Sequence, residues 1–421
     1  MSESPLRTDI VVLGAGLAGL AAARLASRAG HRVIVLDPAP PGGRGRTDRR
    51  GAVLFNRGPH ALYLQGPAHR LLVELGVPVT GGPPVADGAA LLGDRIAPLP
   101  GAATALVRTS LLGFRGKLAI ARLMARLPRL DVGRLAEQSF EDWMLDAALP
   151  DDARLLVEML ARVASYTNAP TIASADLVVG QMQLAMRHGV RYLDGGWQTL
   201  VDALAAGLHI ERGAVSSVCH DGTQVVVERV DGSLVLGTSC IVAVGTPDLA
   251  ATLVGRSAFD IGPAVEASCL DLATSTPARP GLLLGVDSPL YLSNHCPPAR
   301  LAPAGVGVAH VAHYLAPGER PDPHVERASL LQHAARAHIT ADHIVDSRYL
   351  HRMTVVGGMA TASGGGMPGR PGVADTGQRN VFLAGDWVGP TGHLLDASMS
   401  SARDAAARAT LAVGSATLVG R

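Results

Sequence analysis

The stretch Ile10-Val11-Val12-Leu13-Gly14-Ala15-Gly16-Leu17-Ala18-Gly19 decides the fold. Its first four residues are apolar and mostly β-branched, as in a buried strand, and residues 17–29 have the pattern of a helix that Gly30 ends. A second strand, 32–36, follows and ends at Asp37. A G-x-G-x-x-G sequence between a strand and a helix is typical of a Rossmann-type dinucleotide-binding unit.

Each glycine of this motif has its own physical task. Gly14 permits the tight turn, Gly16 lets a diphosphate approach the backbone, and Gly19 lets the helix pack closely on the strand. The helix N-terminus at Leu17 and Ala18 offers unpaired N–H groups and a partial positive charge to phosphate. A glycine-rich turn that binds nothing is the alternative, but the strand, the turn and the helix together indicate a nucleotide-binding site.

The segment Asp37 to Thr47 favours FAD over NAD. Asp37 can accept a hydrogen bond from an adenosine ribose hydroxyl. Beyond it, in Pro41-Gly42-Gly43-Arg44-Gly45-Arg46-Thr47, Gly43 lets the backbone pass close to a dinucleotide that continues into a ribityl chain. Arg44 and Arg46 can fork to phosphate or ribityl oxygens. A flexible loop with solvated arginines is the alternative for this segment.

A third segment lies near the C-terminus, in Asn380-Val381-Phe382-Leu383-Ala384-Gly385-Asp386-Trp387. The strand 381–384 ends in Gly385 and Asp386, so the carboxylate projects from the strand edge where α/β proteins bind ligands. A helix at roughly 394–413 would point its N–H groups at the flavin and stabilise the negative charge of the reduced ring. The three segments together predict one bound FAD.

These segments resemble the flavin-dependent amine oxidase superfamily, which includes phytoene desaturases and protoporphyrinogen oxidases, over nearly the whole chain. The resemblance implies that residues 51–60 (GAVLFNRGPH) face the flavin, that Val215 touches adenine, and that residues 191–204 return from a substrate domain. It also implies that Leu395 and Ala397 of the C-terminal motif bind the cofactor. The cofactor-binding residues expected on all these grounds are Gly14, Gly16, Leu17, Ala18, Gly19, Asp37, Gly43, Arg44, Arg46, Gly58, Pro59, Val215, Gly385, Asp386, Leu395 and Ala397.

The expected fold class is α/β, a Rossmann-type FAD-binding domain interleaved with a second, α+β substrate domain. We assign 1–80, 191–260 and 350–421 to the FAD-binding domain, and 81–190 and 261–349 to the substrate domain. The pattern is helical from about 65 to 190, and strands are expected over 215–244 and 265–315.

Two positions depart from the superfamily pattern. The C-terminal helix starts with Asp396-Ala397 where Gly-Ala is common, so Asp396 is either an extra carboxylate near the flavin or a capping acid. His393 stands where amine oxidases have an aromatic residue beside the flavin, and it is the one weak catalytic candidate. Lys117, the only lysine, lies in an amphipathic helical stretch far from the flavin motifs. Amine oxidation is therefore disfavoured.

A desaturase-like or dehydrogenase-like reaction on a small, apolar metabolite fits better, with hydride transfer to flavin N5. The Leu- and Met-rich helices at 111–163 could line an apolar pocket, contact a membrane peripherally, or form an ordinary core. Two alternatives stay open: a redox-neutral flavin-dependent isomerase, and a non-catalytic module that binds prenyl groups or lipids, as escort proteins of the same fold do.

Other partners are not expected from the sequence. The net charge of +1 argues against nucleic-acid binding. His310 and His313 would face opposite sides of a strand, and neither they nor His295 have metal-ligand spacing, so no metal is expected. The four cysteines are widely spaced and read as free thiols, and no signal peptide or membrane-spanning run is evident, which predicts a cytoplasmic protein. Nothing in the sequence specifies an oligomeric state.

Overall fold

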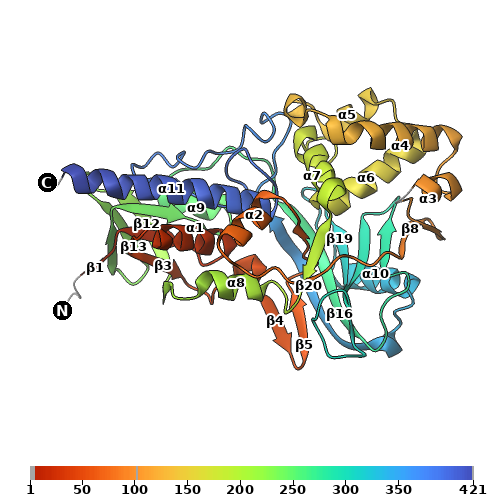
Figure 1. The fold of residues 1–421 in the computed structure, drawn as a ribbon, viewed down its shortest axis with the longest axis horizontal. Helices are drawn as coiled ribbons and strands as arrows, with labels where there is room; N and C mark the ends of the chain where they lie inside the picture. The colour runs from red at the N-terminus through yellow and green to blue at the C-terminus, as the bar shows by residue number, and fades with distance from the viewer. Residues whose placement is uncertain (1–4, 101–102, 420–421) are drawn as a thin grey trace.

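The structure is a computed structural model that describes residues 5–100 and 103–419. The chain forms an elongated molecule with a Rossmann-type half at one end and a large antiparallel-rich sheet with a helical layer at the other (Figure 1). Both chain ends lie at the Rossmann end (Figure 1). The α/β class and the interleaving of the two halves agree with the sequence.

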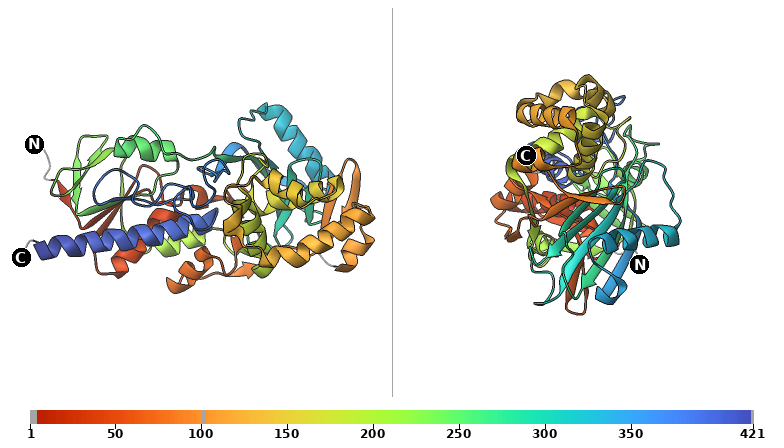
Figure 2. Two further views of the ribbon diagram at one scale, coloured as in Figure 1. Left: turned by 90° about the horizontal axis from the view of Figure 1, so that it is seen from above. Right: turned by 90° about the vertical axis from the view of Figure 1, so that its right-hand side faces the viewer.

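The Rossmann half is built on a five-stranded parallel sheet of apolar, β-branched segments. Its order is β11 (His209–Arg212), β3 (Val33–Asp37), β2 (Ile10–Leu13), β15 (Ser239–Val242) and β21 (Val381–Leu383). The helices α1 (Leu17–Arg28) and α11 (Leu395–Val419) lie side by side along it (Figures 1 and 2). Parallel strands bring all their carboxyl ends to one edge, which places Leu13, Asp37 and Ala384 along the same edge of the sheet.

Two small sheets and further helices complete this half. The strands β1 (Leu6–Arg7), β14 (Leu234–Gly237), β13 (Val225–Arg229) and β12 (Val215–His220) form one sheet. A second joins β6 (Leu62–Tyr63), β10 (Val190–Leu193) and β7 (Gly81–Gly82). The helices are α2 (Pro67–Glu74), α8 (Gln198–Ala205) and α9 (Pro247–Val254).

The other half rests on a seven-stranded mixed sheet. Its order is β20 (Ile344–Val356), β16 (Val265–Thr274), β19 (Gly307–Tyr314), β18 (Leu290–Cys296), β17 (Leu282–Gly285), β8 (Gly88–Leu92) and β9 (Arg95–Pro98). Residues alternate between its two faces. One face packs on α10 (Pro323–Arg336), and the other packs on a helical layer. That layer holds α3 (Ala103–Arg108), α4 (Phe114–Arg126), α5 (Phe140–Asp146), α6 (Asp151–Ser165) and α7 (Ala175–His188).

The sequence misses parts of this sheet. The strands β8 and β9 interrupt the region 65–190 that was expected to be helical. The division at 349/350 falls within β20, which pairs with β16 from Ile344 to Val356. A boundary after Val356 keeps the sheet whole, because the pairing continues to the end of the strand. The hairpin of β4 (Thr47–Arg50) and β5 (Val53–Asn56) was also not predicted.

Candidate cofactor and substrate site

One cavity of about 1430 Å³ runs from the carboxyl edge of the parallel sheet to the helical layer. It exceeds the roughly 300–1,000 Å³ of a pocket for one drug-sized ligand, as a site for a larger ligand requires. Most of the predicted cofactor residues line it: Gly14, Gly16, Leu17, Ala18, Asp37, Gly43, Arg44, Pro59, Val215, Gly385, Asp386 and Leu395. Segments far apart in the chain therefore meet on one elongated space.

The glycine-rich turn has the shape that a diphosphate requires. Gly14 has φ +101°, and a Cβ there would lie 2.4 Å from the Ala243 carbonyl oxygen. At Gly16 a Cβ would meet no atom within 4 Å, so it would fill open space at the start of α1. Gly42 donates its N–H to the Ala15 carbonyl at 2.8 Å, which brings the Gly42–Gly43 backbone beside the turn. An open cradle lined by backbone at a helix N-terminus fits a phosphate group.

Asp37 orders the same turn from the end of β3. One carboxylate oxygen accepts the Ala15 N–H at 2.7 Å, and the other accepts the Ala39 N–H at 2.8 Å. The side chain also lines the cavity. Asp37 thus fixes the backbone on which the glycine motif depends, in addition to facing the space expected to hold a ribose.

The second and third segments touch each other directly. Nη1 of Arg44 lies 2.8 Å from Oδ2 of Asp386, and the other carboxylate oxygen of Asp386 accepts the Gly357 N–H at 3.2 Å. Asp386 is only 3% exposed, and both side chains line the cavity. Residues separated by more than three hundred positions in the chain thus share one site.

Two residues that the sequence did not single out hold this third segment in place. Arg370 is buried and donates to the carbonyl oxygens of Asp386 and Gly392, at 3.2 and 3.0 Å. Burial lowers the pKa of Arg370 to about 10. The Ser401 hydroxyl on α11 accepts the Gly385 N–H at 3.0 Å and donates to the Gly385 carbonyl at 2.9 Å. Arg370 lies in the glycine-rich loop 364–372, where a single arginine carries no recognisable sequence signal.

Four predicted residues are not on the cavity wall. A Cβ on Gly19 would meet the Gly14 carbonyl oxygen at 1.9 Å, so this glycine serves helix–strand packing, as expected. Arg46 turns instead to Asp48, with Nε 3.0 Å from its carboxylate. Gly58 has φ +82° and packs against Met353. Ala397 is fully buried in α11.

His393 is adjacent to the cavity wall but does not form part of it. The side chain is 2% exposed, and its Nε2 donates to the Ser165 carbonyl oxygen at 2.9 Å. Burial lowers the pKa of His393 to about 4, so the ring is neutral. The next residue, Leu394, takes φ +54° and lines the cavity together with Leu395 at the start of α11. The imidazole therefore ties the turn before α11 to α6.

Asp396 caps a helix, but not the one at whose start it lies. It lies in the first turn of α11 and lines the cavity, but its carboxylate accepts the Ala68 N–H at 2.7 Å and so caps the neighbouring helix α2. Burial raises the pKa of Asp396 to about 6. The space around it is tight, since a Cβ on Gly66 or Gly392 would lie within 3 Å of its side chain.

A wall of tyrosines was not predicted. The chain has six tyrosines, and five of them line the cavity: Tyr63, Tyr166, Tyr192, Tyr291 and Tyr314. The rings of Tyr166 and Tyr314 are edge-to-face at 5.4 Å, and the Tyr63 hydroxyl donates to the Ala164 carbonyl at 2.7 Å. Burial raises the pKa of these tyrosines, so all five stay neutral. Because tyrosine is rare in this chain, each tyrosine could have been considered as a site residue. The five come from separate segments of the chain, so the sequence does not show that they meet.

The remainder of this end of the cavity is apolar. No Asp, Glu, Lys or Arg occurs among the described lining residues from α4, α6, α7 and the seven-stranded sheet. Those lining residues include Ile120, Met124, Leu156, Leu160, Val163, Met182, Met186, Leu282, Leu350 and Met353. Lys117 does not approach this wall, because its Nζ donates to the Val107 carbonyl at 2.6 Å.

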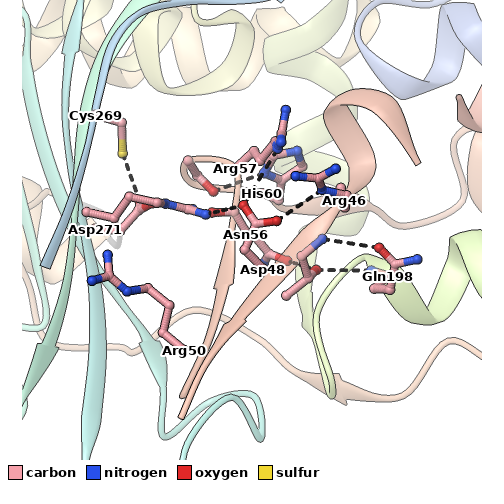
Figure 3. Close-up of polar contacts among 12 residues, drawn as sticks. Arg46, Asp48, Arg50, Asn56, Arg57, His60, Gln198, Cys269 and Asp271 are labelled. Carbon is pink, nitrogen blue, oxygen red and sulfur yellow. Dashed lines mark hydrogen bonds and ion pairs between the residues drawn. The ribbon is translucent and has the colours of Figure 1, made fainter. Parts of the chain in front are cut away.

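An ionic network centred on a buried carboxylate joins the β4–β5 hairpin to the seven-stranded sheet (Figure 3). Asp271 is fully buried and accepts from His310 Nδ1 at 2.5 Å, from Arg348 Nε at 2.9 Å and from the Cys269 thiol at 3.1 Å. Burial alone would raise the pKa of Asp271, but the charges and hydrogen bonds of His310 and Arg348 outweigh it and lower the pKa. Arg348 also donates to Asp48 at 2.6 Å and to the Asn56 carbonyl.

This network fixes the loop that carries Pro59 and His60 to the cavity. Asn56 accepts from the Thr47 hydroxyl at 2.7 Å and from the Trp197 N–H at 3.0 Å. Cys269, Asp271 and His310 are the residue types that bind metals, but Asp271 already has Arg348 and His310 as partners. His313 has different partners, Glu326 and Glu319, as expected for the opposite face of the strand. All four cysteines are free thiols, as predicted.

Comparisons with known proteins agree with this arrangement. Residues 17–410 match the family model of the flavin containing amine oxidoreductases. A Mycobacterium tuberculosis protein described as a flavin-containing monoamine oxidase, AofH, is 27% identical over 252 residues, 56% of this chain. The match spans about half of that relative's length, 50%.

Solved structures share the fold over almost the whole chain. An oxidoreductase from Methanosarcina mazei has a TM-score of 0.72 at 17% identity, covering 94% of this chain and 99% of that one. Cyclohexylamine oxidase from Brevibacterium oxydans has a TM-score of 0.70 at 14% identity, with 97% and 99% covered. The family match over most of the sequence leads to one assignment: the chain belongs to the flavin-containing amine oxidoreductase family, which implies FAD as its cofactor.

Proposed function

We propose that the chain dehydrogenates or desaturates a small, apolar metabolite, with hydride passing from substrate carbon to N5 of FAD. The observation that supports this best is the neutral wall of tyrosine, leucine and methionine side chains at the helical end of the cavity. An uncharged substrate loses little solvation free energy when it binds against such a wall, whereas a charged substrate would lose its water without gaining a counter-charge.

The predicted cofactor residues on the cavity wall would hold the FAD. The turn at Gly14–Ala18 would take the diphosphate, Asp37 the adenosine ribose, Val215 the adenine, and Asp386 the ribityl chain. FAD supplies a two-electron acceptor when bound. The N–H groups of α11, at Leu395 and beyond, are oriented to stabilise negative charge that develops ahead of the helix.

The protein's own contribution in this reaction is orientation and exclusion of water. The rings of Tyr166, Tyr291 and Tyr314 are neutral, and Tyr314 packs edge-to-face against each of the other two. They can position an apolar carbon without donating charge to it. His393 is then a positioning residue that fixes the turn before α11. The proton that desaturation releases in addition to the hydride would pass to solvent where the cavity wall reaches the surface at Met186.

Amine oxidation is the main competing activity, because relatives carry the names of amine oxidases. Asp396 is a carboxylate on the cavity wall, but it comes from α11 and already accepts the Ala68 N–H. The described lining residues of the helical layer and the large sheet add no carboxylate, so an alkylammonium ion against them would lack a counter-charge. Family membership also favours an enzyme over the non-catalytic lipid carrier. The flavin-dependent isomerase remains the second candidate, since the same neutral wall suits it.

The test is anaerobic reduction of the purified, FAD-loaded protein. Matched ring compounds such as cyclohexanone and cyclohexylamine differ in charge but little in shape. We expect neutral, apolar compounds to bleach the visible flavin absorption in a single turnover with net oxidation of the substrate, and ammonium compounds to leave it unchanged. Bleaching by the amines alone would overturn the proposal. Conversion without net oxidation would support the isomerase, and a protein that binds lipid but no flavin would support the carrier.

Two further expectations, on the domains and on the location, accompany this proposal. The division into an FAD-binding and a substrate domain is retained, with its last boundary moved past Val356. A cytoplasmic location with peripheral membrane contact is proposed for uptake of the apolar substrate. Among the described residues, no helix combines the length and apolar character needed to cross a bilayer.

A further inference from the structure

The segment between Asp94 and Asp131 is strongly basic. It contains seven arginine and lysine residues and no Asp or Glu, although the whole chain has 37 basic and 36 acidic residues. The helices α3 and α4 come from this segment and lie at the end of the molecule away from the chain termini (Figure 1). The excess positive charge therefore belongs to α3 and α4 themselves, since residues 131–158, which form α5 and the start of α6 in the same layer, carry eight acidic and two basic residues.

The outer face of α4 carries apolar and basic side chains together. Phe114, Leu118, Ala121 and Ala125 follow each other at helical spacing and are exposed, with Phe114 84% and Leu118 41% accessible. Arginines at 115, 122 and 126 flank this stripe and are exposed too. None of these three, nor Arg108, forms an ion pair with any residue in 5–100 or 103–419. An exposed aromatic ring among unpaired arginines is unusual for a face that only meets water.

The inner face of the same helix belongs to the substrate end of the cavity. Ile120 and Met124 line it. The end of α4 is tied to α7 because Gln183 donates to the carbonyls of Leu127 and Leu130 at 2.7 and 2.9 Å. Met186 on α7 also lines the cavity and is 44% exposed, so the apolar wall reaches the surface beside this helix.

We propose that α3 and α4 dock on an anionic lipid bilayer, with α4 lying in the plane of the interface. Phe114, Leu118 and Val107, which is 72% exposed, would enter the headgroup region, and the arginines would contact lipid phosphates. A nucleic acid would satisfy the arginines but leave the apolar stripe unburied. The docking itself does not depend on the proposed function; only the delivery of an apolar substrate from the bilayer rests on it.

The experiment is co-sedimentation of the full-length, FAD-loaded protein with vesicles, without substrate. Vesicles of phosphatidylcholine are compared with vesicles that also contain phosphatidylglycerol. We expect binding only to the anionic vesicles and weaker binding as salt is raised. The variant R115Q/R122Q/R126Q should bind about a hundredfold more weakly, because each arginine near an anionic surface contributes roughly a fivefold factor. Phe114→Ser should also weaken binding.

Matched controls separate this surface from general charge. The variant R49Q/R327Q/R379Q removes three exposed arginines elsewhere, and Leu411→Ser removes an apolar side chain that is 70% exposed on α11. Both should bind as the parent does, with flavin absorption confirming that every variant is folded. Equal loss in the controls, equal binding to neutral vesicles, or retention on DNA that Phe114→Ser leaves unchanged would overturn the proposal. Reduction of the flavin by a dissolved substrate, assayed on the same variants, tests the proposed function separately.

Discussion

At the scale of single residues, the buried carboxyl groups carry the largest energetic consequences. Asp396 has a pKa raised by burial to about 6, against an ordinary value of 3.8. A raised pKa means that the folded state favours the protonated acid, so its contribution to stability is present below about pH 4 and is lost as pH rises through 6. The difference corresponds to about 3 kcal/mol.

Asp396→Asn tests this. The amide oxygen can still accept the Ala68 N–H, while the titration disappears. We expect the variant to be more stable than the parent at pH 7.5 by up to about 3 kcal/mol and equal to it at pH 4. Urea unfolding at both values measures the difference. A variant less stable than the parent at pH 7.5 would show that the charged form is the one the fold requires.

The Asp271–Arg348 pair gives a prediction of the opposite sign. Asp271→Asn leaves a buried guanidinium without its closest counter-charge, and we expect a loss of about 3–5 kcal/mol in the free energy of unfolding. Adding Arg348→Met should restore part of that loss, because the double variant no longer has a guanidinium without its counter-charge. Asp94→Asn is the control. The Asp94 side chain pairs with Arg336 but is 87% exposed, so this substitution should lower the free energy of unfolding by under about 1 kcal/mol. Additive single and double losses would contradict the coupling.

At the scale of elements, a substitution in the β2–α1–β3 unit can test whether this unit binds the FAD diphosphate. A methyl group at Gly16 meets no atom within 4 Å, so Gly16→Ala should fold normally and yet fill the proposed diphosphate cradle. We expect FAD affinity to fall at least about tenfold, or 1.4 kcal/mol. Gly414→Ala on α11, where a methyl also meets nothing, should bind FAD as the parent does. Flavin titration of the apoprotein measures both, and unchanged affinity in Gly16→Ala would place the diphosphate elsewhere.

The same scale shows why part of the structure was predictable from sequence. The strands β2, β3 and β21 are short apolar runs with glycine or aspartate at their ends, and their cofactor residues follow from strand geometry. The strand β20 is half-buried along almost its whole length, with no period-2 alternation of apolar residues, so it was missed. The tyrosine wall and Arg370 were missed for another reason: their role arises only when distant elements pack together.

At the scale of the whole molecule, the site couples the two halves. Its wall takes Asp37 and Val215 from one end, Asp386 and Leu395 from the C-terminal segment, and Met353 from β20 of the large sheet. Arg44 itself donates to the Val355 carbonyl at 3.2 Å. A ligand that fills this space contacts elements of both halves at once. Its binding should therefore stabilise both halves together.

Thermal unfolding of apoprotein and FAD-loaded protein tests that coupling. A ligand bound only to the folded state at a hundred times its Kd adds about 2.7 kcal/mol, which should raise one common transition. ADP lacks the flavin and would occupy only the nucleotide end of the cavity. At a concentration that saturates the protein, ADP should protect β2 and β3 from amide exchange, whereas β20 should exchange as in the apoprotein. FAD should protect all three strands, because Met353 and Val355 of β20 also line the cavity. Two separate transitions, with only the Rossmann half shifted by FAD, would show that the halves unfold independently and that the large sheet takes no part in holding the cofactor.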